Sequence, residues 1–167
     1  MDERLHIIFA RRSIRRYTDT SISEADIDSL LQAGMAAPSA ANLKPWHFYV
    51  VTDRKALQTL AEVNPYGKML AQAGLAIAVC GDPSISDWWV QDCTAATENI
   101  LIAATALGLG AVWLGFYPRE ERWRGAQRVL GIPERVIPLA VIALGQPAER
   151  KDPAGRFDRS FIHRDRW

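Results

Sequence analysis

The chain has no excess of either charge. Among its 167 residues, 20 are Lys or Arg and 19 are Asp or Glu, which gives a formal net charge of +1. A balance of this kind provides no general field that would attract nucleic acid or an anionic membrane surface. We therefore expect neither as a partner, although a neutral total is compatible with a local basic site.

Cysteine and histidine are scarce. The two cysteines, Cys80 and Cys93, lie in apolar stretches and do not form a CxxC pair. This pattern favours reduced core thiols in a reducing compartment. The three histidines, His6, His47 and His163, have no spacing that suggests a shared metal. The sequence therefore predicts no metal site.

Segments typical of secretion or membrane insertion are also missing. The N-terminus has no basic region followed by an apolar one, so no signal peptide and a cytoplasmic location are predicted. Residues 99–118 carry no charge and could span a bilayer by length. Glycines interrupt this stretch, however, and after Gly110 it changes from Ala/Leu-rich to Val/Trp-rich. It therefore favours a buried helix followed by a buried strand.

Common catalytic and nucleotide-binding motifs are absent as well. There is no GxSxG and no P-loop pattern. The glycine-rich stretch at residues 108–115 is not a dinucleotide fingerprint, because Trp113 stands where the third glycine would be and the stretch follows a helix. The sequence therefore contains neither the serine-nucleophile motif nor the phosphate-binding loops that these patterns would indicate.

What remains is an ordinary globular composition, with 49% apolar and 23% charged residues and no repeat or linker. This predicts one domain over residues 1–167. One helix is expected between a capping Ser23 and Pro38, with Met35 on its apolar face. Further helices are expected at residues 5–10, 54–61, 68–73, 87–107 and 119–130, and strands at 47–52, 75–80, 110–116 and 136–144. Together they predict an α+β domain with a central sheet of about four strands.

The C-terminal residues 146–167 form a polar tail with little periodicity. Its arginines and apolar residues are Arg156, Arg159, Arg164, Arg166, Phe157, Phe161, Ile162 and Trp167. A tail this short cannot bury its apolar side chains within itself. We expect it to dock on another surface, either of its own chain or of a partner subunit.

The first candidate binding segment is the basic run at residues 11–16. Arg11, Arg12 and Arg15 offer planar guanidinium forks that suit phosphate, and Ser13 adds a small donor. A solvated basic turn or a nucleic-acid patch would show the same composition. The run taken alone favours the solvated turn.

The second candidate is a loop of small residues at positions 36–46. Small side chains between Pro38 and Pro45 would let the backbone approach a flat ligand closely. Ser39 and Asn42 add hydrogen-bonding groups of short reach. In isolation, an ordinary helix-to-strand loop is the more common explanation.

The third candidate is the glycine stretch at residues 108–115. A helix cap with close helix–strand packing accounts for Gly108 but not for Gly115, at the end of the expected strand. The pair Trp88 and Trp89 at the start of the long helix is more typical of a core than of a site.

Taken together, the three segments resemble the nitroreductase family of FMN-dependent oxidoreductases. Residues 141–149 resemble that family's last strand, and Arg156-Phe157-Asp158 with His163 and Trp167 is similar to the ending of its short members. The resemblance covers nearly the whole chain in order. It implies an α+β fold with a mainly antiparallel sheet, and an entwined homodimer with FMN where the subunits meet.

The resemblance also implies roles for individual residues. One subunit would hold FMN through Arg11, Arg12, Ser13 and Arg15, and the other through Pro38, Ser39, Ala40 and Asn42. Leu114 and Gly115 would approach the reactive N5 edge of the flavin, Arg156 would lie near its phosphate, and Lys68 would reach its pyrimidine end.

The implied activity is hydride transfer from NADH or NADPH through flavin N5 to a small oxidised acceptor, such as a nitroaromatic or a quinone. The cofactor carries this chemistry, in agreement with the missing catalytic motifs. Arg15 near the ring would favour the reduced, anionic flavin. Two alternatives stay open. One is a different reaction on the same scaffold, such as enone reduction, dehydrogenation or dehalogenation; the other is a non-enzymatic dimer that binds a phosphorylated ligand.

Overall fold

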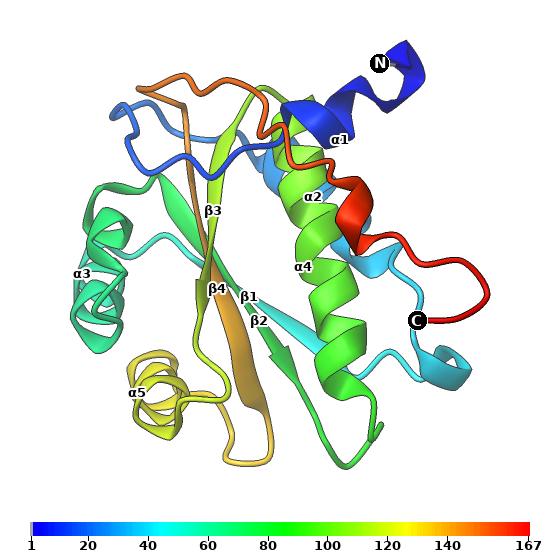
Figure 1. Cartoon of the computed structure of the whole chain (residues 1–167). Coiled ribbons are helices and arrows are strands. Elements are labelled where there is room, and N and C mark those ends of the chain that lie inside the picture. Colours follow the sequence, from blue (N-terminus) through cyan, green and yellow to red (C-terminus); the bar gives the residue numbers. More distant parts are fainter. Residues whose placement is uncertain (1) are drawn as a thin grey trace.

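A computed structural model describes residues 2–167 and shows helices on both sides of one sheet (Figure 1). The strands are β1 (Trp46–Val51), β2 (Leu75–Gly81), β3 (Gly110–Gly115) and β4 (Ile137–Gly145). The α-helices are α1 (His6–Ala10), α2 (Glu24–Met35), α3 (Arg54–Val63), α4 (Trp89–Ala106) and α5 (Glu120–Leu130). The 3-10 turns are η1 (Glu3–Leu5), η2 (Ala40–Asn42), η3 (Lys68–Gln72) and η4 (Arg159–Phe161).

The strands form a four-stranded antiparallel sheet in the order β1-β2-β4-β3. This confirms the predicted α+β class and the number of strands. Each residue of β2 is buried, because side chains alternate between the two faces and both faces are covered. Ala76, Ala78 and Cys80 join the core on one face, and Leu75, Ile77 and Val79 join the core on the other.

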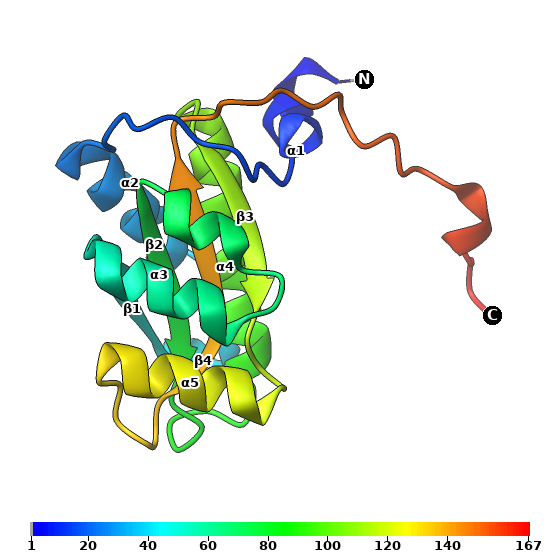
Figure 2. The ribbon, with the colours of Figure 1, turned by 90° about the vertical axis from the view of Figure 1, so that its left-hand side faces the viewer.

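The helices divide between the faces of the sheet. Helices α3 and α5 cover one face, and α2 and α4 cover the other (Figures 1 and 2). Helix α2 begins where the capping residue predicts, since the Ser23 hydroxyl oxygen accepts a hydrogen bond from the Asp26 N–H at 3.1 Å. Gly108 follows α4 with a φ of 72°, a left-handed conformation that glycine adopts without strain. The start of α2 and the end of α4 are therefore both set by residues at the helix ends themselves.

Most element boundaries lie within two residues of the prediction. Three details differ. Residues 68–72 form a 3-10 helix, which suits so short a segment. Met35 was expected on the buried face of its helix but is exposed. Trp89 packs into the core as expected, whereas Trp88 is 58% exposed, because the chain enters α4 between the two residues.

The C-terminal tail leaves the body of the molecule (Figure 2). Its only regular element in the described chain is η4. Phe157, Phe161 and Trp167 are 76%, 81% and 100% exposed, so their own chain does not bury them. The start of the tail does dock on the chain's own body, because Glu149 and Lys151 bind the backbone of residues 13–15, whereas these aromatic residues further on stay uncovered.

The uncharged stretch at residues 99–118 divides into the second half of α4 and strand β3, as expected. Within residues 2–167, no helix combines the length and the apolar character needed to cross a bilayer.

Candidate active site

Strand β3 lies at the edge of the sheet and has one side free. Ala111 and Gly115 direct their carbonyls to this side, where they accept hydrogen bonds from the Ile14 N–H at 2.9 Å and from Asn64 Nδ2 at 3.0 Å. Every second residue of a strand points its N–H and C=O to the same side. The N–H groups of Trp113 and Gly115 therefore face the same free edge.

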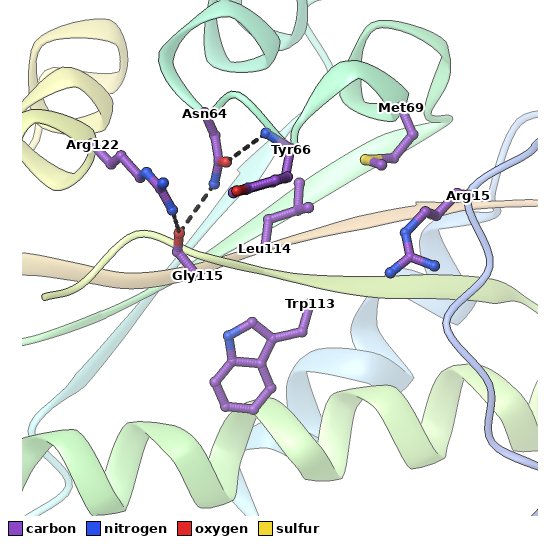
Figure 3. A pocket seen from close by; sticks show the side chains of 8 residues that line it. All are labelled: Arg15, Asn64, Tyr66, Met69, Trp113, Leu114, Gly115 and Arg122. Carbon is purple, nitrogen blue, oxygen red and sulfur yellow. Dashed lines mark hydrogen bonds between the residues drawn. The ribbon is translucent and has the colours of Figure 1, made fainter. Parts of the chain in front are cut away.

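A cavity of about 480 Å³ lies beside this edge (Figure 3). Three lining residues come from β3, three from the segment that follows α3, one from the basic segment and one from α5. They are Trp113, Leu114 and Gly115; Asn64, Tyr66 and Met69; Arg15; and Arg122. Lys68, expected at a flavin's pyrimidine end, does not line this cavity, and its neighbour Met69 does.

Gly115 lines the cavity with backbone alone, and the space that a side chain would occupy is empty. A Cβ added at Gly115 would meet no atom within 4 Å. A Cβ at Gly110 would lie 2.7 Å from Ile14, and one at Gly145 would lie 2.8 Å from Tyr17. Internal packing thus explains the glycines at 110 and 145 but not the one at 115. The backbone at Gly115 is accessible for close approach by a ligand.

Asn64 holds the wall of the cavity in place. It is 1% exposed, and its amide donates to the Gly115 carbonyl at 3.0 Å while its side-chain oxygen accepts the Tyr66 N–H, also at 3.0 Å. The residue thereby ties the turn after α3 to the end of β3. Asn64 was not predicted as a site residue, because the helix was expected to end at residue 61. An Asn directly before Pro65 is a turn signal that could have drawn attention to it.

The backbone of the basic segment is clamped by residues that follow β4. Glu149 Oε1 accepts a hydrogen bond from the Arg15 N–H at 2.6 Å, and Lys151 Nζ donates to the Ser13 carbonyl at 2.7 Å. Lys151 also forms an ion pair with Glu149 at 3.1 Å. The pKa of the Glu149 carboxyl lies below its usual value. The main cause is the hydrogen bond from the Arg15 N–H, and Lys151 adds a smaller contribution. The segment is thus a fixed structure rather than a solvated turn.

The side chains of the basic segment go to different places. The Arg15 guanidinium points into the β3 cavity (Figure 3). Arg11 pairs with Glu98 at 3.3 Å and lines a second cavity, of about 450 Å³, together with Arg156. Arg12 and Ser13 line neither cavity. Arg11 and Arg156 therefore line the same cavity, although they are 145 residues apart in the sequence.

The small-residue loop lies elsewhere. The structure places Pro38, Ser39 and Asn42 outside the β3 cavity, and Ala40 lines a separate hollow beside Trp88. Within one chain, this loop and the β3 cavity are not brought together.

The loop has an unusual backbone. Ala41, Asn42 and Lys44 have φ values of 49°, 56° and 52°, in the left-handed region that side chains disfavour. The buried Asp92 carboxylate accepts the Ala40 N–H at 3.0 Å and the Ser86 hydroxyl at 3.2 Å. One carboxylate at the start of α4 therefore anchors a strained loop.

The groups around the β3 cavity are mainly donors. Two of the eight lining side chains are arginines, and none is a carboxylate. No group of three or more His, Cys, Asp or Glu side chains within residues 2–167 could hold a metal ion. The cavity can thus offer positive charge and backbone N–H groups to a flat ligand with acceptors on its edge.

Comparisons with known proteins identify a family and several similar chains. The model of the nitroreductase family matches residues 8–66 and 61–146. A protein of Archaeoglobus fulgidus, provisionally named NADH dehydrogenase/NAD(P)H nitroreductase, is 51% identical over 174 residues that cover all of both chains.

Two solved structures are similar over nearly the whole chain. One, from Parabacteroides distasonis and provisionally named like the Archaeoglobus protein, has a TM-score of 0.97 at 42% identity and covers all of both chains. The other, from Desulfovibrio desulfuricans, is a provisionally named nitroreductase in complex with FMN. It has a TM-score of 0.85 at 34% identity and covers 100% of this chain and 99% of its own.

Proposed function

The chain belongs to the nitroreductase family, and from this premise we propose that it is an FMN-dependent oxidoreductase. It would pass reducing equivalents from NADH or NADPH to a small oxidised acceptor, such as a nitroaromatic or a quinone. The names of relatives support NAD(P)H as the donor, and the Desulfovibrio structure supports FMN as the cofactor. Because the relatives are named as enzymes, the alternative of a non-enzymatic phospholigand-binding dimer is not retained.

The observation that carries the proposal is the empty space beside the Gly115 backbone in the β3 cavity. FMN has a flat ring with nitrogen and oxygen acceptors along its edge, and the residues present fit such a ring. Gly115 offers space where a Cβ would otherwise stand, and the free edge of β3 offers backbone N–H groups. When bound, FMN would supply the capacity to accept a hydride and pass on its electrons.

The residues around the cavity would orient and tune this group. Arg15 adds a fixed positive charge on one side, and an opposite charge favours a more negative state of the ring. Asn64 fixes the Gly115 carbonyl, so that the edge is ordered before a ligand arrives. We propose that Leu114 and Gly115 face the ring and that Arg11, Arg12, Ser13 and Arg156 bind the phosphate. The shared cavity of Arg11 and Arg156 supports the last assignment.

We further propose that the protein is a homodimer and that the small-residue loop serves the site of the second copy. Pro38, Ser39, Ala40 and Asn42 lie outside the β3 cavity of their own chain, so a second chain would have to bring them to it. The exposed aromatic residues of the tail need a surface that their own chain does not supply. The cytoplasmic location remains a prediction.

An absorption spectrum of the purified protein tests the proposal. We expect a yellow protein, or one that takes up added FMN, whose flavin band bleaches when NADH or NADPH is added without oxygen. A colourless protein that takes up no FMN would overturn it. Turnover with a nitroaromatic, a quinone and an enone, compared at equal concentration, would then identify the preferred acceptor among the reactions that this scaffold supports.

A further inference from the structure

No carboxylate within residues 2–167 forms an ion pair with Arg122. Its Nε atom is buried, and within residues 2–167 it has no hydrogen-bond acceptor. Its Nη1 atom lies 3.5 Å from the Gly115 carbonyl, which already accepts the shorter bond from Asn64. Arg124, one half-turn further on, forms an ion pair with Glu120 at 2.6 Å instead. The described chain therefore gives Arg124 a charged partner, whereas Arg122 has only a long bond to a carbonyl and a buried Nε without an acceptor.

The position of Arg122 in its helix is unfavourable for a cation. It lies in the first turn of α5, where the helix carries a partial positive charge that disfavours a cation. No carboxylate lines the cavity that Arg122 borders. Stability of the helix thus does not account for an arginine here, and an anion brought by a ligand would.

An aromatic ring lies beside the guanidinium of Arg122. The Arg122 guanidinium carbon is 5.6 Å from the centre of the Tyr66 ring, which is 72% exposed and lines the same cavity. Contact with an aromatic face restrains a guanidinium and leaves its donors available. Arg15 lies at the opposite end of the cavity (Figure 3). The cavity thus has a cation at each end and an aromatic side chain between them.

We propose that Arg122 determines the class of electron acceptor, by binding the carboxylate of a flat aromatic acid while Tyr66 contacts the ring. This rests on the proposed function, because it assumes that FMN occupies the part of the cavity next to Arg15 and β3. The guanidinium fork matches a carboxylate with two parallel hydrogen bonds. A neutral aromatic of equal size would lack this anchor.

Equilibrium binding to the oxidised, FMN-loaded protein tests the proposal. The probes are 4-nitrobenzoate and 4-nitrobenzamide, which have nearly the same shape and differ in charge, and the readout is the change in the visible flavin band. For Arg122→Gln we expect about 10- to 100-fold weaker binding of the benzoate. Binding of the benzamide should change less than about twofold, since loss of a mere packing contact would affect both probes alike.

Two further variants sharpen the test. Arg122→Lys keeps the charge without the fork, so it should recover part of the benzoate affinity. Arg124→Gln removes a nearby charge that already has a partner, and it should leave both affinities as in the wild type. If Arg122→Gln fails to fold, the comparison of wild type with Arg122→Lys still decides, because equal benzoate affinities in these two proteins would contradict the fork.

Three results would overturn the inference. Equal weakening of both probes by Arg122→Gln would make Arg122 a packing residue. Loss of FMN from this variant alone would make it a cofactor-binding residue. A raised KM for NADH and NADPH with unchanged benzoate affinity would show that the anion is a phosphate of the dinucleotide. If the wild-type protein takes up no FMN, that result contradicts the proposed function itself, and the inference about Arg122 fails with it.

Discussion

The basic segment, residues 11–16, and the small-residue loop, residues 36–46, are predicted to face the same ligand. In each of them a carboxylate accepts a backbone N–H, but only the loop adopts a left-handed backbone. The basic segment is held by Glu149 and Lys151, which bind its backbone rather than its arginine side chains. The loop has three left-handed residues and is anchored through the Ala40 N–H to Asp92.

The difference follows from what each segment offers. Arginine side chains are long, so a segment that binds through them needs only an approximate backbone position. A loop of small residues has only its backbone and short side chains to present, so its path must be set closely. Strain at Ala41, Asn42 and Lys44 is consistent with that demand, because it persists only where surrounding contacts hold the backbone.

Removing a side chain from the basic segment should affect the ligand and not the fold. Arg15→Ala should weaken FMN binding by about 10- to 100-fold, because a charge-assisted contact is lost. It should also lower the reduction potential of bound FMN. Fluorescence titration with FMN and anaerobic redox titration measure the two effects. Arg16→Ala, at an exposed neighbour, is the matched control, and equal FMN affinities in the two variants would refute the role of Arg15.

Removing the anchor of the loop should affect the fold itself. Asp92→Ala leaves the Ala40 N–H and the Ser86 hydroxyl without their acceptor, which should lower the free energy of unfolding by about 1–3 kcal/mol. Urea unfolding gives this quantity. Ser86→Ala keeps the bond from Ala40, but it removes one donor to Asp92 together with the acceptor of the Trp88 N–H. A loss below about 0.5 kcal/mol for Asp92→Ala would contradict the anchoring role of Asp92.

The clamp of the basic segment should depend on pH. The pKa of Glu149 lies below its ordinary value of 4.5, so its contribution to stability is present above that value and is lost as the pH falls through the lowered pKa. Glu149→Gln should therefore cost about 0.5–1.5 kcal/mol at pH 7 and progressively less below about pH 4.5. Unfolding of both proteins across pH 3–7 measures the difference. Glu62→Gln, at an exposed carboxylate, should show no such trend.

The smallest effect should come from relieving strain in the loop. Ala41→Gly should raise the free energy of unfolding by about 0.5–1 kcal/mol, because glycine adopts a positive φ without steric cost. Asn42→Gly should give less, since Asn tolerates this conformation better than Ala does. Thermal unfolding ranks the two variants. A lower melting temperature for Ala41→Gly than for the wild type would show that the loop is not strained at this residue.

Much of the fold could be predicted from local patterns. The apolar run at residues 75–80 predicted a strand buried on both sides, and Gly108 predicted the end of the long helix. Both are consequences of short-range chemistry, which a sequence displays directly. The prediction was weaker for Met35 and Trp88, because apolar side chains at helix ends are exposed or buried according to how neighbouring elements pack.

The candidate site was predictable only in part. Arg15, Leu114 and Gly115 were singled out from sequence and line one cavity. Asn64, Tyr66, Met69 and Arg122 were missed. Arg122 stands in a polar, amphipathic helix whose pattern is that of a solvated surface, so nothing local marks it as an arginine that pairs with no carboxylate of residues 2–167.

By itself, the sequence determined the order of helices and strands, the helix caps, and the segments rich in arginine, in small residues and in glycine. These depend on neighbours within a few positions along the chain. Only the tertiary structure decided that β3 lies at the sheet edge with free N–H groups, that Glu149 clamps Arg15, and that Arg122 and Asn64 meet at Gly115. Strand order and the packing of distant elements set these contacts, and hydrophobic periodicity contains no information about which strand lies at the edge.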